Sequence, residues 1–175
     1  MKKLLSLAAL LATMAVAQAQ LLYTASLDGA QDGGDLRQGT GFVDVQLNGT
    51  TLTFQGSFSG LTTPASLAHI HGPSGLFPAS ATVIYNLGNN GIPLGATSGT
   101  INGTVNLVPL QSGNYTVAEQ IDDLNNSQWY FNIHNNTFGQ GEIRGQIIPV
   151  PEPSSLALIG LGLGSTLLWL RRRKS

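Results

Sequence analysis

The chain has 175 residues, a formal net charge of −1 and no cysteine, which excludes a disulfide framework and thiol chemistry. Its basic clusters lie at the two ends, and residues 20–149 carry two arginines against eight carboxylates, a net charge of −6 with histidine neutral. This acidic middle lacks the positive surface that binds nucleic acid, so nucleic acid is excluded as a partner.

The first 19 residues have the pattern of a secretory signal peptide. A basic start (Met1–Lys3) precedes an apolar run (Leu4–Val16) and the small-x-small sequence Ala17–Ala19. We expect cleavage after Ala19, because the apolar run is short for a permanent span of about 20 residues. Residues 20–149 then form one domain, which is long enough to bury a core without disulfides.

The sequence of this domain predicts an all-β fold. Short runs that alternate apolar and polar residues are separated by Gly- and Pro-rich connections. Asn48-Gly49 predicts a type I′ hairpin turn, and Val117–Leu124 fits either a short helix or a loop. We therefore expect an antiparallel β-sandwich or flattened Greek-key barrel. The expected strands are 22–27, 41–47, 52–58, 67–71, 82–87, 100–107, 129–134 and 142–148.

All three histidines lie in two of the expected strands. His69 and His71 are two residues apart, so their side chains share one face, and His134 ends another strand. If these strands are neighbours, three imidazoles converge on one copper or zinc ion and leave one position open. Glu142 is a candidate fourth ligand or an acceptor for an imidazole N–H. We expect Arg144 to pair with Glu142 or a nearby aspartate.

A plainer interpretation stays open, in which the histidines decorate the rim and hydrogen-bond to loop carbonyls. Other chemistries have less support. The chain has no Gly-x-Ser-x-Gly elbow for a hydrolase triad, and Asp122-Asp123 is expected to be solvated. The aspartates of residues 28–35 resemble a calcium loop but lack the EF-hand spacing and its closing glutamate.

The C-terminal segment, residues 150–175, has three parts. Pro151-Glu152-Pro153 is followed by an apolar run (Leu156–Leu170) and then by Arg171-Arg172-Arg173-Lys174. This order resembles the PEP-CTERM sorting signal of bacterial surface proteins. The resemblance implies a hydrophobic helix that anchors the precursor transiently in the inner membrane, with the cationic end in the cytoplasm. It also implies a sorting protease of the exosortase type, which cuts the signal and releases the domain to the cell surface or medium.

The domain itself resembles the CHRD family in three blocks: Ala68–Pro73 (AHIHGP), Trp129–His134 (WYFNIH) and Gly141–Ile147 (GEIRGQI). This resemblance implies an extracellular all-β domain without a defined molecular activity. A looser likeness to copper/zinc superoxide dismutase, another β-sandwich with His-x-His on a strand, implies a fold of that kind. Three histidines are too few for its dinuclear site, so its activity is not implied.

These patterns lead to one main functional hypothesis and two alternatives. The main hypothesis is an exported, non-enzymatic module that binds an unidentified ligand at the cell surface or in the matrix. The first alternative is a mononuclear copper- or zinc-binding protein that uses His69, His71 and His134, with Glu142 nearby. The second is an adhesion or matrix protein that binds polysaccharide or another protein.

Overall fold

The computed structural model describes residues 21–33, 36–76, 78–88 and 91–151. The predicted signal peptide and the predicted hydrophobic helix after Pro153 lie outside these ranges. Within them, no helix has the length and hydrophobicity that crossing a membrane requires.

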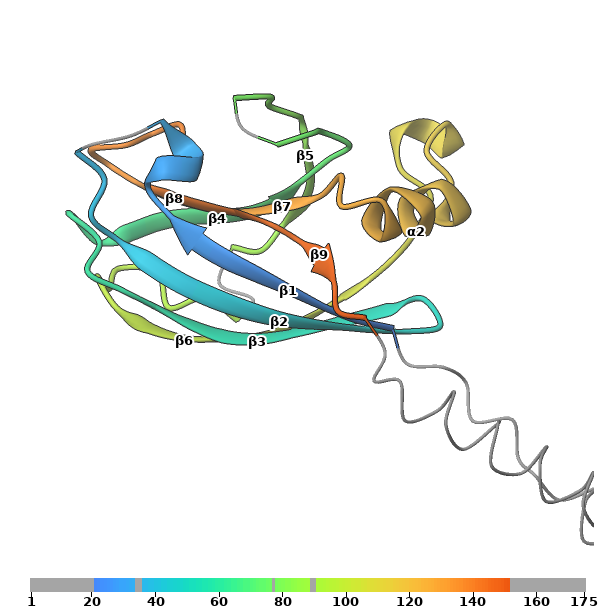
Figure 1. The fold of residues 1–175 in the computed structure, drawn as a ribbon, viewed down its shortest axis with the longest axis horizontal. Coiled ribbons are helices and arrows are strands. Elements are labelled where there is room, and N and C mark those ends of the chain that lie inside the picture. The colour runs from blue at the N-terminus through green and yellow to red at the C-terminus, as the bar shows by residue number, and fades with distance from the viewer. Residues whose placement is uncertain (1–20, 34–35, 77, 89–90, 152–175) are drawn as a thin grey trace, which may run out of the picture.

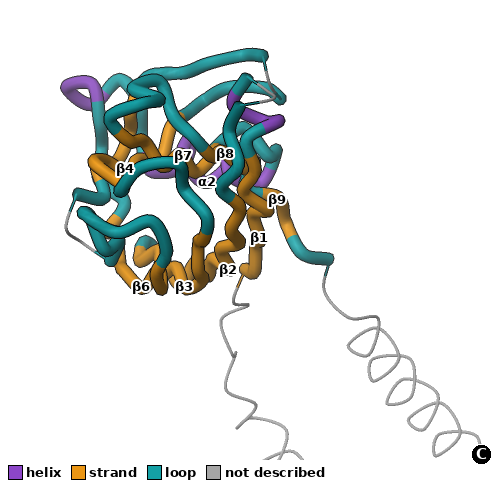
Figure 2. Tube along the Cα trace, turned by 90° about the vertical axis from the view of Figure 1, so that its left-hand side faces the viewer, coloured by secondary structure: helices purple, strands orange, loops and turns teal. Residues whose placement is uncertain are grey.

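Among the described residues, nine strands pair antiparallel in a single sheet of order β5-β4-β7-β8-β1-β2-β3-β6, with β9 also paired to β1. The sheet bends into two layers, in which β4, β7 and β8 lie over β1, β2, β3 and β6 (Figures 1 and 2). The strands are β1 (Leu21–Asp28), β2 (Thr40–Asn48), β3 (Thr51–Ser59), β4 (Ala65–His71), β5 (Val83–Asn86), β6 (Gly99–Asn106), β7 (Tyr130–Asn135), β8 (Ile143–Gln146) and β9 (Ile148–Pro149). The predicted all-β antiparallel fold is confirmed, in the form of a nearly closed barrel.

The segment 91–97 spans the gap between the start of β4 and β6, the last strand of the sheet. Ala65 at the start of β4 donates its N–H to the Ala96 carbonyl at 2.9 Å and accepts from Gly95 at 2.8 Å. On the other side, Asn102 of β6 donates to the Gly91 carbonyl at 2.8 Å. These bonds satisfy backbone groups that an open sheet would leave unpaired at its edges.

Each of the eight predicted runs forms a strand, and the last is divided between β8 and β9. The β2–β3 hairpin is present, but its turn is displaced by one residue from the prediction. Asn48 pairs with Thr51, so Gly49 and Thr50 are the two turn residues. Gly49 has a φ of +61°, which glycine adopts without steric cost at the first position of such a turn.

The ambiguous segment of residues 117–124 is a helix, α2 (Val117–Asn125). It begins with a capping box in which Thr116 and Glu119 satisfy each other's backbone N–H groups. Gln120 and Leu124 are buried on its inner face. The helix lies at one end of the barrel (Figure 1).

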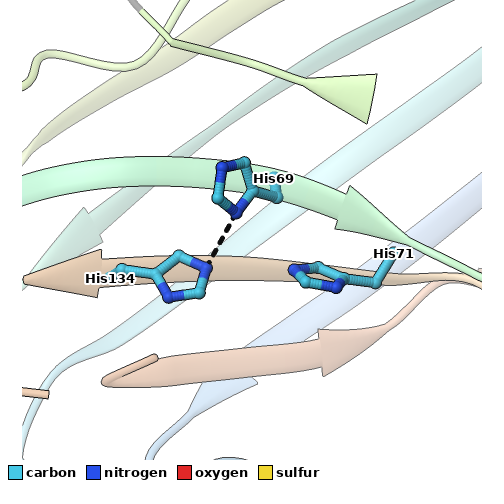
Figure 3. A group of neighbouring side chains, drawn as sticks. All are labelled: His69, His71 and His134. Atoms are coloured by element: carbon cyan, nitrogen blue, oxygen red, sulfur yellow. Dashed lines mark hydrogen bonds between the residues drawn. The ribbon is translucent and has the colours of Figure 1, made fainter. Parts of the chain in front are cut away.

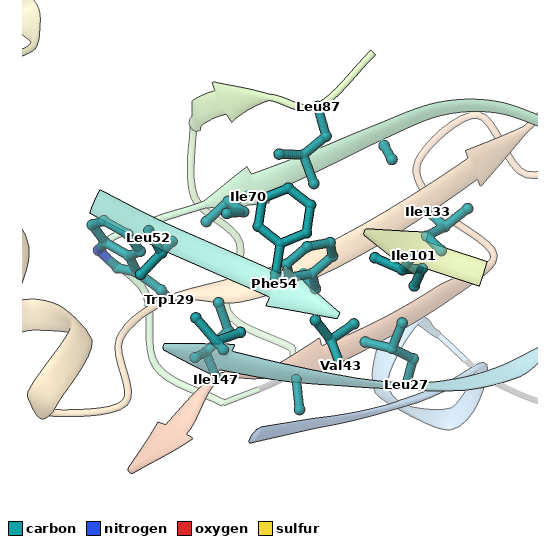
Figure 4. Close-up of a cluster of buried hydrophobic side chains, with 14 of the residues drawn as sticks. Leu27, Val43, Leu52, Phe54, Ile70, Leu87, Ile101, Trp129, Ile133 and Ile147 are labelled. Atoms are coloured by element: carbon teal, nitrogen blue, oxygen red, sulfur yellow. The ribbon is translucent and has the colours of Figure 1, made fainter. Parts of the chain in front are cut away.

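The apolar core fills the space between the two layers (Figure 4). Phe54 of β3 meets Phe131 of β7 edge to face, with ring centroids 5.4 Å apart, and both side chains are fully buried. Ala68 and Ile70 of β4 also point into this core, as the alternation of β4 predicted. The histidines on the same strand therefore point away from the core.

A second buried layer, made of polar side chains, covers the outer face of β4, β7 and β8. Connecting loops fold over this face and supply backbone carbonyls to it. Gln146 donates to the carbonyls of Ser74 and Ser127, at 3.1 and 2.6 Å. Burying so many polar groups is tolerable only when most of them find partners. The buried polar residues of this face are His71, Asn132, His134, Arg144 and Gln146.

Candidate metal centre

β4 and β7 are adjacent antiparallel strands, and this pairing brings the three histidines together. His69 lies opposite Asn132, while His134 lies opposite Leu67, so His69 and His134 are diagonal neighbours on the outer face. His71 follows two residues after His69 on the same face (Figure 3). One nitrogen from each ring can be chosen so that the three atoms all lie within 4.8 Å of one another.

Two of the rings are held by backbone carbonyls through their Nδ1 atoms. His71 Nδ1 is 2.9 Å from the carbonyl oxygen of Ala81, and His134 Nδ1 is 3.1 Å from that of Gly139. A carbonyl oxygen only accepts, so Nδ1 of each ring must carry the proton. Each Nε2 then presents a lone pair, which is the arrangement that metal-binding histidines adopt.

His71 Nε2 is buried and has no hydrogen-bond partner. Leaving a buried polar atom unpaired costs about 1–3 kcal/mol. The bonds from His71 and His134 to loop carbonyls agree with the plainer interpretation of these histidines, and the buried Nε2 of His71 is the feature that this interpretation leaves unexplained.

His69 is the half-buried member of the group, and its Nδ1 lies 3.0 Å from His134 Nε2 (Figure 3). Because His134 Nε2 has a lone pair, His69 Nδ1–H donates this bond in the metal-free state. Two nitrogens bound to one tetrahedral ion at about 2.0–2.1 Å lie about 3.3 Å apart. The ring of His69 would thus need only a small displacement, with its proton moved to Nε2, to share an ion with His134.

Burial keeps the imidazoles neutral. It lowers the pKa of His134 to about 4, against the opposing effect of the Gly139 carbonyl. Burial also lowers the pKa values of His71 and His69 below the ordinary 6.5. Neutral rings at pH 7 have lone pairs available for a metal.

A stack of planar groups supports His71 from beside the cluster. The His71 ring lies parallel to Tyr130, with centroids 4.7 Å apart, and the Arg144 guanidinium carbon is 3.5 Å from the Tyr130 centroid. At these distances the Tyr130 ring has room for His71 on one face and for the Arg144 guanidinium on the other. Arg144 donates to the Ala79 and Gly75 carbonyls, at 2.7 and 3.3 Å. Of the two partners predicted for Arg144, a nearby aspartate is present: burial lowers the pKa of Arg144, and the charge of Asp32 acts electrostatically to raise it. The guanidinium itself contacts the two carbonyls and the Tyr130 ring and does not contact Glu142.

Glu142 lies outside the histidine group. Its fully buried carboxylate accepts from the Thr62 N–H and hydroxyl, at 2.8 and 2.9 Å, and from the Gly39 N–H at 3.3 Å. Asn135 Nδ2 donates to its other oxygen. With these donors around it, the carboxylate joins loops at the end of the barrel, and it hydrogen-bonds to none of the three imidazoles.

Sequence reasoning identified the three histidines but missed the groups that orient them. The carbonyls of Ala81 and Gly139 have no signature in the sequence, because every residue carries one. The position of Tyr130 beside the histidines could have been predicted, since it lies two residues before Asn132 and therefore shares the face of Asn132 and His134. The aspartates of the calcium-like segment do not gather into a possible metal site among the described residues. Asp28 instead accepts a hydrogen bond from the Gln31 N–H, at 2.8 Å.

Comparison with known proteins yields two matches to family models. A CHRD domain matches residues 23–147, more than half of the chain, and a PEP-CTERM protein-sorting motif matches residues 149–174. No curated protein and no solved structure matches the chain.

Proposed function

The chain belongs to the CHRD-domain family, and from this premise we propose that its domain acts outside the cytoplasm by binding one copper or zinc ion. The sorting motif indicates an exported protein whose membrane-associated precursor is recognised by exosortase-type machinery. We propose that residues 20–149 are the working domain, and that it is delivered to the cell surface or the extracellular matrix.

The observation that carries the metal proposal is the state of His71. Its Nδ1 is fixed by the Ala81 carbonyl, and its buried Nε2 points toward the cluster without a partner. A histidine that only decorated the rim would leave its second nitrogen in water. An ion held jointly with His69 and His134 would satisfy that nitrogen and offset the cost of burying it.

The donor set limits the choice of ion. Three imidazole nitrogens suit copper and zinc, whereas calcium and magnesium prefer oxygen ligands. Three protein ligands leave a fourth position for water or another small ligand. His69 is the most exposed of the three rings, so we place this position on its side of the cluster. We propose binding or buffering of the ion as the function, with no catalytic step.

Calorimetric titration of the tag-free domain with Cu(II) and with Zn(II) tests the proposal. We expect one site per chain with micromolar or tighter affinity. His71→Ala and His134→Ala should abolish saturable binding, while Gln55→Ala, at an exposed position of β3, should leave it unchanged. An absence of saturable binding for both ions would refute the metal function.

A further inference from the structure

The first residues of the sorting motif belong to a strand of the barrel. Ile148 and Pro149 form β9, which pairs with Thr24 and Tyr23 of β1. Val150 continues the same register, because its N–H donates to the Leu22 carbonyl at 2.8 Å. The matched motif starts at residue 149, so its first residues are held against β1.

β9 buries fewer side chains than the strand before it. Ile147 is fully buried and donates its N–H to the Trp129 carbonyl at 2.8 Å. The side chains of the next three residues, Ile148 to Val150, are exposed, and Pro149 has no N–H to donate. Residues 148–150 can therefore leave β1 without opening the core, with Ile147 as the fixed point.

One recurring mode of peptide recognition takes the segment in extended form, with its backbone groups free to pair with the partner. In the folded domain, backbone groups of residues 148–150 are paired with β1, immediately before Pro151-Glu152-Pro153. β1 of the barrel wall lies directly beside residues 148–150. Both features restrict access to the segment on the N-terminal side of the motif.

We propose that β9 is a releasable latch strand: the sorting enzyme takes Ile148–Val150 as part of its recognition strand only after they detach from β1. The enzyme replaces β1 as the pairing partner of this segment. The rate of processing then follows the fraction of molecules in which β9 is detached, as it does for proteolysis of other locally opened states. This inference does not depend on metal binding.

A reversible disulfide between β9 and β1 tests the latch, and the absence of native cysteine makes the engineered pair unambiguous. Thr24 and Ile148 are directly opposite, and opposite Cα atoms about 4.5–5.5 Å apart fall within the range that a disulfide spans. The full-length precursor with Thr24→Cys and Ile148→Cys is expressed in a host that contains the sorting system. The matched control is Gln55→Cys with Asn102→Cys, an exposed opposite pair on β3 and β6.

Processing is measured in isolated membranes as loss of the C-terminal tail, before and after reduction. We expect the oxidised β1–β9 variant to be processed at least about tenfold more slowly than the parent, with recovery on reduction, because the bond removes the detached state. The control pair should be processed at the parent rate in both states. Parent-like processing of the oxidised β1–β9 variant would overturn the proposal. Slow processing of the reduced variant, or of Ile148→Cys alone, would also overturn the proposal, because it would indicate that the enzyme recognises the Ile148 side chain instead.

Discussion

His69 Nδ1 lies 3.0 Å from His134 Nε2, although the two residues are 65 positions apart in the chain. In the metal-free state the proton that His69 donates occupies the lone pair of His134. An ion must displace this proton to bind His134, so metal and the His69–His134 hydrogen bond exclude each other. The three side chains already lie together without an ion, which would reduce the ordering that binding of an ion requires.

Metal should stabilise the folded domain. At a free ion concentration of about 100 times Kd, linkage gives about 2.7 kcal/mol, which corresponds to a rise in Tm of roughly 10 °C for a domain of this size. We expect this rise for the parent, measured by differential scanning calorimetry, and none for His134→Ala. An equal rise in both proteins would indicate binding at another place.

The neutral state of His134 makes stability depend on pH. Its pKa is about 4 in the folded domain, below the ordinary 6.5. As the pH falls from 6.5 toward 4, the unfolded chain takes up a proton that the folded ring refuses, so stability present above pH 6.5 is lost. We expect a loss of about 2 kcal/mol after allowance for partial solvent screening.

Urea unfolding of the metal-free parent and of His134→Gln across this range measures the effect. Asp32 contributes in the opposite direction, because burial raises its pKa to about 6 and its protonation favours the folded state as the pH falls. The difference between the two proteins removes this contribution. A parent whose stability falls no more steeply with acid than that of His134→Gln would contradict the assignment.

Glu142 should contribute to the stability of the folded domain and not to its affinity for metal. Glu142→Gln places an amide donor among groups that already donate to the carboxylate, and we expect a loss of about 2–4 kcal/mol in the free energy of unfolding. Glu119→Gln is the matched control, since glutamine can still complete the capping box of α2. The metal Kd of both variants should stay within about threefold of the parent, because neither carboxylate belongs to the histidine group that we propose as the site. A much weaker Kd for Glu142→Gln alone would restore Glu142 as a ligand.

Arg144 should affect metal affinity indirectly, because it holds the Tyr130 ring on which His71 is stacked. Lysine cannot both lie flat on Tyr130 and donate to two carbonyls as the guanidinium does. We expect Arg144→Lys to weaken metal affinity by about tenfold, a typical effect for groups that orient a ligand. The titration is run on protein whose circular dichroism matches the parent, and unchanged affinity would show that the Tyr130–Arg144 stack does not orient His71 for the metal.

The sorting motif gives a prediction at the level of the cell. Replacement of Arg171, Arg172 and Arg173 with serine removes most of the charge that holds the C-terminal end in the cytoplasm. We expect the precursor to accumulate in the membrane fraction or to be missorted, as fractionation and immunoblotting would detect. Normal processing and delivery of this variant would contradict the role of the cationic end.

The strands were predictable because each alternates locally, and this alternation also assigned Ala68 and Ile70 to the core. The division between β8 and β9 was not predictable, since it depends on the bond from Ile147 to Trp129. The helix at residues 117–125 was ambiguous because only three apolar positions mark its face. Its Thr116–Glu119 capping box was a signal that could have resolved it.

The histidine cluster was only half predictable. The spacing of His69 and His71 placed them on one face, but the position of His134 depends on the β4–β7 pairing, which no local pattern specifies. Glu142 shares the alternation of β8, and that pattern suggested a ligand. Hydrogen bonds from Thr62 and Gly39, remote in the sequence, determine its role instead.

Histidine side-chain ¹⁵N NMR of the domain, with and without one equivalent of Zn(II), tests the central claim most directly. The structure predicts that the metal-free His71 and His134 rings are neutral and protonated at Nδ1. On zinc addition, Nε2 of both rings and one nitrogen of His69 should take the shift of a ligating nitrogen, while Nδ1 of His71 and His134 stays protonated. Imidazole spectra unchanged by zinc would contradict the claim that these three side chains form one metal site.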